Sequence, residues 1–262
     1  MRPHRINALV IRHLYLFKRS VPRLMDIFYW PVMELLLWGF LSIYLEKQDL
    51  GNLNAVTVFL GAVIFWDILN QSQKAVSISF LEDVWERNFL NLFVTPIRLG
   101  EFIVSTVVLG IIRIVIITIV MALLAALFYS FNFLSLGFYL IPFMASLLLF
   151  GSTLGFLSMA VILRFGTSAQ ILAWGFIVLI QPFTAVFYPV SALPEAIRPI
   201  SYLLPSTYVF EGMRTVLSDA PLPWSTLGMS FLLNAVFLTI IIWVFYKMFA
   251  KVKERGLLLK MD

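Results

Sequence analysis

The sequence predicts an all-α integral membrane protein with six transmembrane helices, an N-terminal amphipathic interfacial helix, and short re-entrant helices between spans five and six. Two observations carry this prediction. Apolar residues make up 61% of the 262 residues and charged residues only 13%, whereas a soluble domain has roughly 45–50% and about 25%. The apolar residues also gather in six continuous stretches, each close to the roughly 20 residues that a helix needs to cross a bilayer.

The six predicted spans are continuous apolar runs, which favours helices over a β-barrel. Barrel strands would be segments of about 10 residues with alternating polarity. The spans are residues 27–45, 53–73, 102–128, 136–163, 169–189 and 226–249. We interpret residues 1–262 as a single transmembrane domain.

Lys and Arg are distributed unequally between the two sides of the predicted bundle. Fifteen fall in the N-terminal arm, in the loops after spans two and four, and in the C-terminal tail, against three on the other side. Cytoplasmic loops carry the excess of Lys and Arg, so both termini are predicted to be cytoplasmic. The net charge of +5 follows from this topology, and we expect no nucleic-acid partner.

Residues 1–25 are predicted to form an amphipathic helix that lies at the cytoplasmic membrane interface. Apolar residues recur at steps of three or four on one face, namely Ile6, Val10, Leu14, Phe17 and Val21. The basic residues of the interface helix are Arg5, Arg12, Lys18 and Arg19. Such a helix places its cations near lipid phosphates. The alternative is a simple topology anchor, and the two are compatible.

The predicted cytoplasmic loop at residues 77–101 is longer than the 2–8 residues that are usual between helices. It contains a short amphipathic segment that ends before Thr95-Pro96, because the residue before a proline avoids the helical region. A short helix that presents aromatic and charged groups to the cytosol suits docking to a partner protein. The alternative is an interfacial linker helix with a solvated charged face.

The predicted external segment at residues 187–224 is rich in proline and yet apolar. Its prolines prevent one long helix, and they are Pro189, Pro194, Pro199, Pro205 and Pro221. Short broken helices that enter the outer leaflet fit this composition, since irregular backbone there must be covered by protein or line a cavity. The segment is therefore expected to line or cap the outer end of a pathway. The alternative is a packed lid without a transport role.

Three ionisable residues, Glu34, Asp67 and Arg113, fall within predicted spans. An isolated charge there costs at least about 2.5–3.5 kcal/mol on insertion scales. We therefore expect all three to face the bundle interior, with Arg113 paired to Glu34 or Asp67. A buried structural ion pair is favoured over a gating pair, because a proton relay usually needs a chain of carboxylates or His.

The sequence lacks the residues that several kinds of chemistry require. The absence of Cys excludes thiol catalysis, and only two His leave little for a metal site or a His-based triad. The phosphate-binding motif G-x-x-x-x-G-K-[ST] is absent, so the chain supplies no Walker-type ATP site. We expect that the chain is not an enzyme and holds no cofactor or metal of its own.

The order of these features resembles the ABC-2 type permease subunits of bacterial ATP-binding-cassette exporters, over essentially the whole chain. The resemblance is carried by the cytoplasmic stretch WERNFLNLFVTPIRLGEF and the external stretch YPVSALPEAIRPISYLLPSTYVFEGMR. Within them, the most specific pieces are Glu86-Arg87 before Thr95-Pro96, and Pro189 and Pro194 before Pro205 and Glu211-Gly212-x-Arg214.

The resemblance implies a division of labour. Residues 82–94 would form a coupling helix that inserts into a separate ATPase subunit, through Glu82, Asp83, Trp85, Glu86, Arg87, Asn88 and Phe89. The external segment would form the outer gate, with Pro189, Pro194, Pro205, Tyr208, Glu211 and Arg214. Two permease copies, expected to be identical, would work with two ATPase copies that bind ATP and Mg, in the bacterial cytoplasmic membrane and in contact with its lipid.

The resemblance implies export but leaves the substrate open. An amphipathic or lipid-like molecule, such as a drug or a lipid, is the first expectation, and a lipid-linked polysaccharide is the second. A function of another class, a self-sufficient secondary transporter or channel, would use Asp67 or Glu34 as titrating groups.

Overall fold

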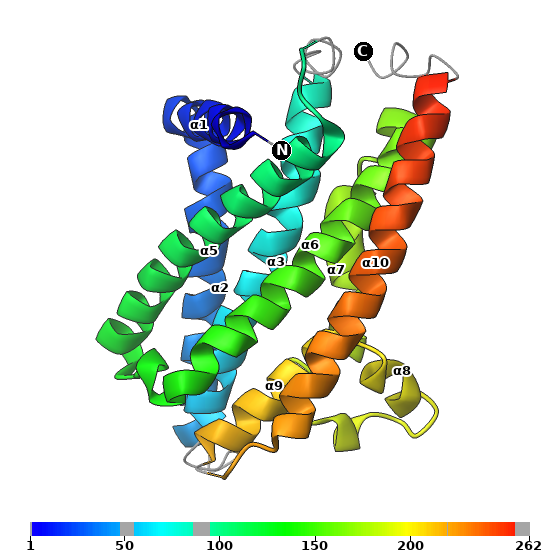
Figure 1. Cartoon of the computed structure of the whole chain (residues 1–262). Helices are drawn as coiled ribbons and strands as arrows, with labels where there is room; N and C mark the ends of the chain where they lie inside the picture. The colour runs from blue at the N-terminus through cyan, green and yellow to red at the C-terminus, as the bar shows by residue number, and fades with distance from the viewer. Residues whose placement is uncertain (1, 48–54, 86–94, 219, 255–262) are drawn as a thin grey trace.

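The computed structural model describes residues 2–47, 55–85, 95–218 and 220–254, and within these the chain is a helical bundle (Figure 1). The long helices run along a common axis. In chain order, the α-helices are α1 (Pro3–Arg19), α2 (Val21–Lys47), α3 (Ala55–Trp85), α5 (Leu99–Tyr129), α6 (Leu140–Phe165), α7 (Leu172–Ile180), α8 (Arg198–Tyr202), α9 (Pro205–Leu217) and α10 (Trp224–Glu254). Short 3-10 helices occupy Phe133–Tyr139, Gly166–Ala169, Gln181–Phe183 and Val190–Ala192.

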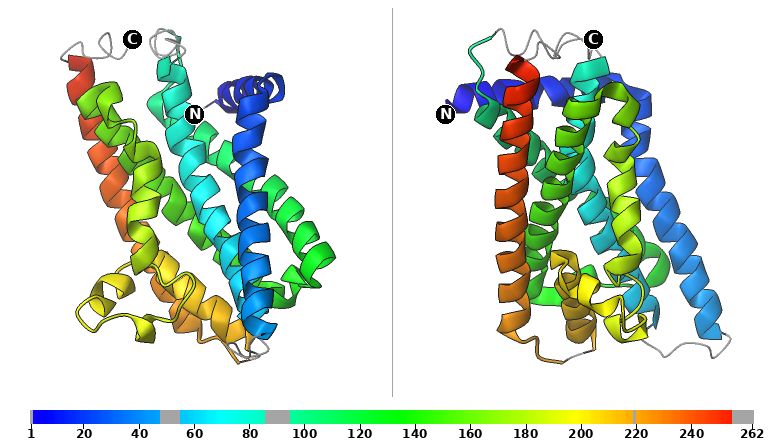
Figure 2. Two further views of the ribbon diagram at one scale, coloured as in Figure 1. Left: turned by 180° about the vertical axis from the view of Figure 1, so that it is seen from behind. Right: turned by 90° about the vertical axis from the view of Figure 1, so that its right-hand side faces the viewer.

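Helix α1 lies across one end of the bundle, and the C-terminal end of α10 reaches the same end (Figures 1 and 2). Pro3 suits the first turn of α1, where its missing N–H would have no helical partner. The helix stops at Ser20, whose backbone is extended, and α2 begins directly after it. We name this end of the bundle the inner end. Helices α8 and α9 lie at the opposite, outer end.

Four of the six predicted spans match helices that are long and apolar enough to cross a membrane. Among the described residues these are Val21–Lys47, Leu99–Tyr129, Phe133–Phe165 and Trp224–Glu254. The second predicted span falls in α3, which is not one of the four. The fifth contains a shorter apolar helix, Trp174–Phe183. Six spans, and the re-entrant nature of the short helices, stay predictions.

The second span is predicted to end at Gln73, and the helix that contains it continues beyond that residue. Helix α3 does not end near Gln73 but continues to Trp85, and α5 begins at Leu99. The polar stretch from Gln71 to Lys74 indicated the end of a span, yet all four of these side chains are buried. Neighbouring helices cover α3 on every side, so polar residues do not interrupt it.

Helix α3 packs against α6 at very short range because α6 presents two glycines. A Cβ atom on Gly151 would lie 2.4 Å from Cβ of Ser72, and one on Gly155 would lie 2.6 Å from Cβ of Val76. Small residues four positions apart let two helix backbones approach closely. Next to this contact, Gln73 donates a hydrogen bond of 3.2 Å to Ser158 on α6.

A buried polar contact joins α6, α9 and α10. The hydroxyl groups of Ser146 and Ser230 lie 2.6 Å apart, and Ser230 also donates to the carbonyl of Pro205 at 2.9 Å. Asn234 donates to the Ser146 hydroxyl at 2.9 Å and to its carbonyl at 3.1 Å. Buried polar groups need such partners, and this set fixes the outer-end helix α9 to two long helices.

Candidate functional site

The inner end of α3 is tied to α1 and α2 by ion pairs between buried carboxylates and partly exposed arginines. Arg12 on α1 lies 2.6 Å from Asp83, and Arg23 on α2 lies 3.1 Å from Glu82. The two carboxylate side chains are 0% and 4% exposed. Glu82 and Asp83, predicted for docking to a partner, therefore face the chain's own N-terminal helices.

His13 lies between the same two carboxylates. Its Nδ1 is 3.8 Å from Glu82 and its Nε2 is 3.8 Å from Asp83, and the side chain is 1% exposed. The imidazole thus adds a third group from the N-terminal helices to this cluster. We name Arg12, His13, Arg23, Glu82 and Asp83 the inner charge cluster.

A second contact holds the start of α1 against the start of α5. Glu101 accepts hydrogen bonds from the backbone N–H groups of Arg2 at 2.8 Å and Arg98 at 3.0 Å. Arg5 lies 3.6 Å from the same carboxylate and also donates to the carbonyl of Pro96. Glu101 stands at the third position of α5, where an acidic side chain caps the helix. Arg5 is the one predicted interface residue in this contact.

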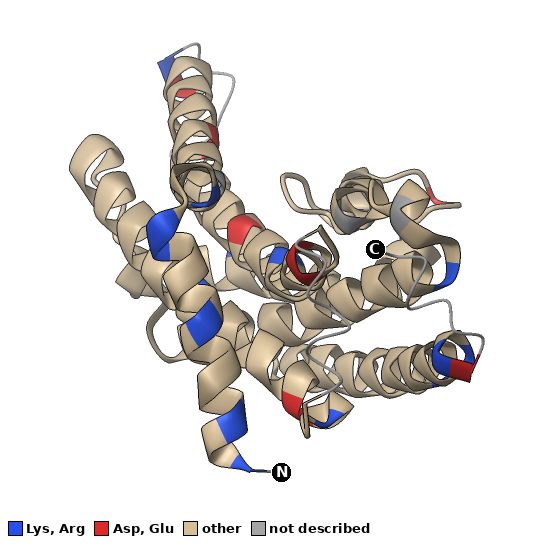
Figure 3. Ribbon diagram, turned by 90° about the horizontal axis from the view of Figure 1, so that it is seen from above, with Lys and Arg blue, Asp and Glu red and all other residues tan. Residues whose placement is uncertain are grey.

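The other predicted inner-end residues have different surroundings. Lys18 and Arg19 are exposed on α1, and Lys and Arg recur along that helix (Figure 3). Trp85 stacks on Trp174 of α7, with ring centroids 6.3 Å apart, and donates to Gln170 at 3.1 Å. The predicted coupling residues that lie outside the described residues are Glu86, Arg87, Asn88 and Phe89.

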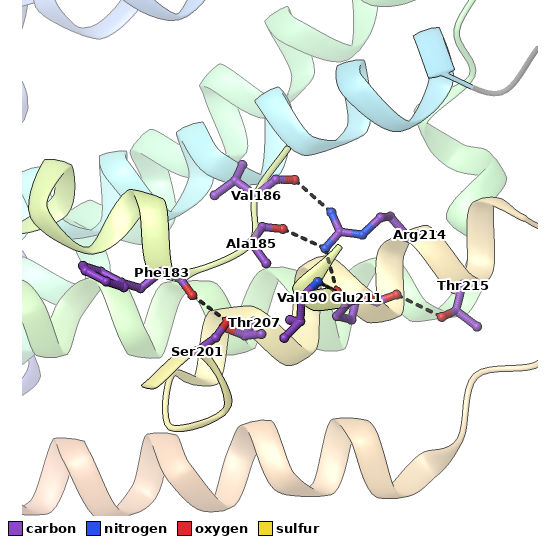
Figure 4. A network of polar contacts seen from close by, with 9 residues as sticks. All are labelled: Phe183, Ala185, Val186, Val190, Ser201, Thr207, Glu211, Arg214 and Thr215. Carbon is purple, nitrogen blue, oxygen red and sulfur yellow. Dashed lines mark hydrogen bonds and ion pairs between the residues drawn. The ribbon is translucent and has the colours of Figure 1, made fainter. Parts of the chain in front are cut away.

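At the outer end, Glu211 and Arg214 join α9 to the segment that follows α7 (Figure 4). Arg214 donates to the carbonyls of Ala185 at 2.7 Å and Val186 at 3.0 Å, and to Glu211 at 3.2 Å. Glu211 accepts from the backbone N–H of Val190 at 2.7 Å. Burial lowers the pKa of the Arg214 guanidinium, and the Glu211 carboxylate opposes that shift. We name this set of contacts the outer clamp.

The other predicted gate residues shape the backbone around the clamp. Pro189 precedes the short helix Val190–Ala192, the Pro194 carbonyl accepts from the N–H of Ile197, and Pro205 begins α9. Tyr208 donates to the Tyr202 carbonyl at 2.9 Å. Burial, together with Tyr202, raises the pKa of the Tyr208 hydroxyl, which keeps it a donor.

The three predicted intramembrane charges lie on three helices. Glu34 is partly buried on α2. Asp67 is buried on α3. The Arg113 guanidinium on α5 lies 4.1 Å from the ring centroid of Phe17 on α1. The predicted pairing of Arg113 with Glu34 or Asp67 stays a prediction.

The sequence matches the family model of the ABC-2 type transporter over residues 5–218. The match runs from α1 to Ser218, just after α9, and so includes both the inner charge cluster and the outer clamp. The chain belongs to the ABC-2 type transporter family. Among curated proteins, nothing matches the sequence.

Membership of the ABC-2 family makes this chain a multi-pass membrane protein and the permease part of an ABC transporter, whose partner is an ABC ATPase. The chemical step of ATP hydrolysis thus belongs to another subunit. In this ABC-2 chain, the two carboxylates of the inner charge cluster lie on α3, the helix that directly precedes residues 86–94.

Sequence reasoning missed His13, Arg23, Glu101 and Trp174. An acidic residue in the first turn of a helix is favourable, but Arg98, three positions before Glu101, is not one of the usual N-cap residues, so no capping-box sequence motif marks this helix start. His13 and Arg12 are adjacent, and so are Glu82 and Asp83, but nothing in the sequence states that α1 crosses α3.

Proposed function

We propose that this ABC-2 permease exports an amphipathic or lipid-like molecule, using ATP hydrolysed by a separate ATPase. It would work as a homodimer with two ATPase copies, in the bacterial cytoplasmic membrane, with the inner end and both termini in the cytoplasm. Within the predicted coupling segment 82–94, residues 86–94 would contact the ATPase, and the ATPase itself would hold ATP and Mg. A conformational shift requires that ATP bind one state of the complex better than the other.

The observation that carries the coupling proposal is the position of α3 in the bundle. Trp85, the last residue of α3, directly precedes residues 86–94 in the chain. From Leu60 to Val84 nearly every side chain of α3 is buried, and its contact with α6 leaves no room even for a Cβ at Gly151. Interiors packed this closely transmit displacement, so motion at residues 86–94 would move α3 and α6 together.

The inner charge cluster supports a role for α1 in the same motion. Arg12 and His13 join α1 to the last turns of α3, and Arg23 joins α2. A displacement of Glu82 and Asp83 would therefore carry α1 and the start of α2 with it. In this proposal, the two acidic residues transmit the movement rather than contact the ATPase.

The outer clamp supports a gate at the other end. Three hydrogen bonds of Glu211 and Arg214 hold residues 185–190 against α9, and α9 is tied to α6 and α10 through Pro205 and Ser230. A shift of α6 would thus reach the clamp. Release of substrate would require residues 185–190 to move relative to the long helices.

Cavities between the membrane-capable helices support a lipid-like substrate. One of about 520 Å³ lies between α6 and α10, with Ile141, Leu227 and Phe231 among its lining residues. Another of about 300 Å³ lies between α5 and α6 and is lined by apolar residues such as Ile114 and Leu148. A lipid-linked polysaccharide, the alternative substrate, would need a polar route for its sugars.

The coupling proposal is tested by replacing Glu86 and Arg87 with Ala together. The complex is purified in mild detergent, and its ATPase content and ATP hydrolysis are measured. We expect the double variant to insert into the membrane normally but to retain much less ATPase. Glu195→Gln, an exposed change in the outer segment, is the control. Unchanged ATPase content and hydrolysis in the double variant would contradict the proposal.

The substrate proposal is tested on the intact complex in lipid nanodiscs. Lipid extract and water-soluble glycan from the source membranes are compared as stimulators of ATP hydrolysis. We expect the lipid extract to stimulate. Stimulation by the glycan fraction alone would favour the polysaccharide alternative.

A further inference from the structure

A cavity of about 220 Å³ opens near the inner end, between α1, α2, α3, α5 and α7. Its apolar wall includes Phe17, Ile27 and Ile78, all of which are buried. The cavity is smaller than the roughly 300–1,000 Å³ of pockets that enclose a drug-sized molecule. The cavity can therefore enclose only one end of an amphiphile, and the rest of the molecule would extend out of it.

Two indole rings form an aromatic wall of this cavity. Trp85 and Trp174 line it and are stacked with an interplanar angle of 20°. Their side chains are 49% and 37% exposed, so a ligand can reach them. Aromatic rings prefer offset-stacked or edge-to-face contact with other rings, and these indoles favour a ligand that carries a flat ring.

The polar part of the cavity carries more positive than negative charge. Its charged lining residues are Arg23, Glu82 and Arg113, which gives two guanidinium groups and one carboxylate. Arg113 is 5% exposed, and its guanidinium is held over the ring of Phe17. A guanidinium group suits sulfonate, carboxylate or phosphate oxygens, because it presents several donors in one plane.

We propose that this cavity binds the anionic, ring-bearing end of an amphiphilic substrate, with the rings against Trp85 and Trp174 and the anionic group toward Arg113. The inference deepens the proposed export of an amphiphile and rests on it. It adds a substrate class, anionic aromatic amphiphiles, and a site at which the permease first holds them.

The test compares two fluorescent probes that share one ring system, 1-anilinonaphthalene-8-sulfonate and its uncharged analogue N-phenyl-1-naphthylamine. The permease–ATPase complex is placed in phosphatidylcholine nanodiscs, and energy transfer from Trp to the probe is titrated, with empty nanodiscs subtracted. We expect the sulfonate to bind at least about tenfold more tightly than the uncharged probe, as a charge-assisted hydrogen bond allows.

Three variants assign the preference to this cavity. Arg113→Gln should remove most of the preference for the sulfonate, and Arg113→Lys should retain part of it. Trp85→Leu with Trp174→Leu should weaken the binding of both probes. Trp243→Leu, an exposed change on α10 outside these cavities, is the matched control and should leave both affinities unchanged.

Equal binding of the two probes by the unsubstituted complex would overturn the inference, as would an unchanged preference in Arg113→Gln. If Arg113→Gln does not fold, the probe affinities of Arg113→Lys and of the Trp85 and Trp174 double variant decide whether the inference holds. ATPase content is measured on the same samples. A complex that retains its ATPase but lacks the sulfonate preference overturns the cavity inference alone, whereas a chain without any ATPase overturns the proposed function.

Discussion

At the scale of single residues, Glu82 and Asp83 show how charges near a membrane can serve the protein's own interior. Both are buried, and their partners come from α1 and α2, some 60 to 70 positions away in the chain. A buried carboxylate without its cation is costly, because its desolvation is no longer compensated. The pair therefore fixes where the N-terminal helix lies.

Replacing Asp83 with Asn should loosen α1 from α3. The change keeps the shape of the side chain but removes the charge that faces Arg12, at a cost of about 1–3 kcal/mol. The chain has no native Cys, so a single Cys in place of buried Leu9 reports the opening through its rate of maleimide labelling. We expect labelling several-fold faster than in the parent, and no change with Arg19→Gln. Equal rates in the Asp83 variant would contradict a structural role for the cluster.

Replacing Arg214 with Lys should weaken the outer clamp. An ammonium group cannot reproduce the planar fork that reaches both Ala185 and Val186. A single Cys in place of Val186, which is 1% exposed, should then react faster with a membrane-impermeant maleimide. Glu195→Gln serves as the control. If Val186→Cys stays protected in the Arg214 variant, the guanidinium does not hold this segment.

At the scale of helices, the close contact of α3 with α6 explains which features of the fold the sequence could reveal. The amphipathic pattern of α1 and the long apolar runs of α5 and α10 are periodic or continuous, so their existence could be predicted. The end of α3 could not, because Gln73 and Lys74 are buried by the glycines and serines of α6 and by other helices. Burial of this kind depends on tertiary contacts, and hydropathy along the chain does not record it.

The residues of the inner and outer sites also differ in how far they could be predicted from the sequence. The basic N-terminal helix and the segment with Glu211 and Arg214 are visible as local motifs. The contact of Glu82 and Asp83 with α1, and of Trp85 with Trp174, depends on how the helices cross. Sequence reasoning thus named residues that the structure joins to other elements, but it assigned Glu82 and Asp83 an exposed docking position, whereas both are buried.

Two glycine-to-alanine changes test the helix contact as a matched pair. Gly155→Ala should destabilise the protein by about 1–3 kcal/mol through overpacking, since the added Cβ would lie 2.6 Å from Cβ of Val76. Gly228→Ala on α10 meets no atom within 4 Å and should be neutral, or stabilising by up to about 1 kcal/mol. Thermal unfolding in detergent measures both. A Tm for Gly155→Ala equal to that of Gly228→Ala would contradict the close packing of α3 and α6.

At the scale of the whole molecule, one path of contacts joins the two ends of the bundle. The inner charge cluster connects α1 and α2 to α3, the glycine contact connects α3 to α6, and Ser146 and Ser230 connect α6 to α9 and α10. The outer clamp then connects α9 to residues 185–190. Such a path suits a permease that receives a movement at one end and opens at the other.

The proposed orientation of the bundle has its own test. Tags added at residues 1 and 262 should both be protected from an external protease in right-side-out membrane vesicles, because Lys and Arg are in excess at the inner end. A tag inserted at Glu195 should be cleaved. Cleavage of either terminal tag in sealed vesicles would contradict the topology.

The measurement that most directly tests the central claim is purification of the tagged chain from its own membranes in mild detergent, with mass spectrometry of the proteins that accompany it. We expect a near-stoichiometric ATPase carrying a Walker motif, lost when Glu86 and Arg87 are replaced together. A chain that purifies without any ATPase and still moves solutes across liposome membranes would contradict the account, and Glu34, Asp67 and Arg113 would then be the groups to study.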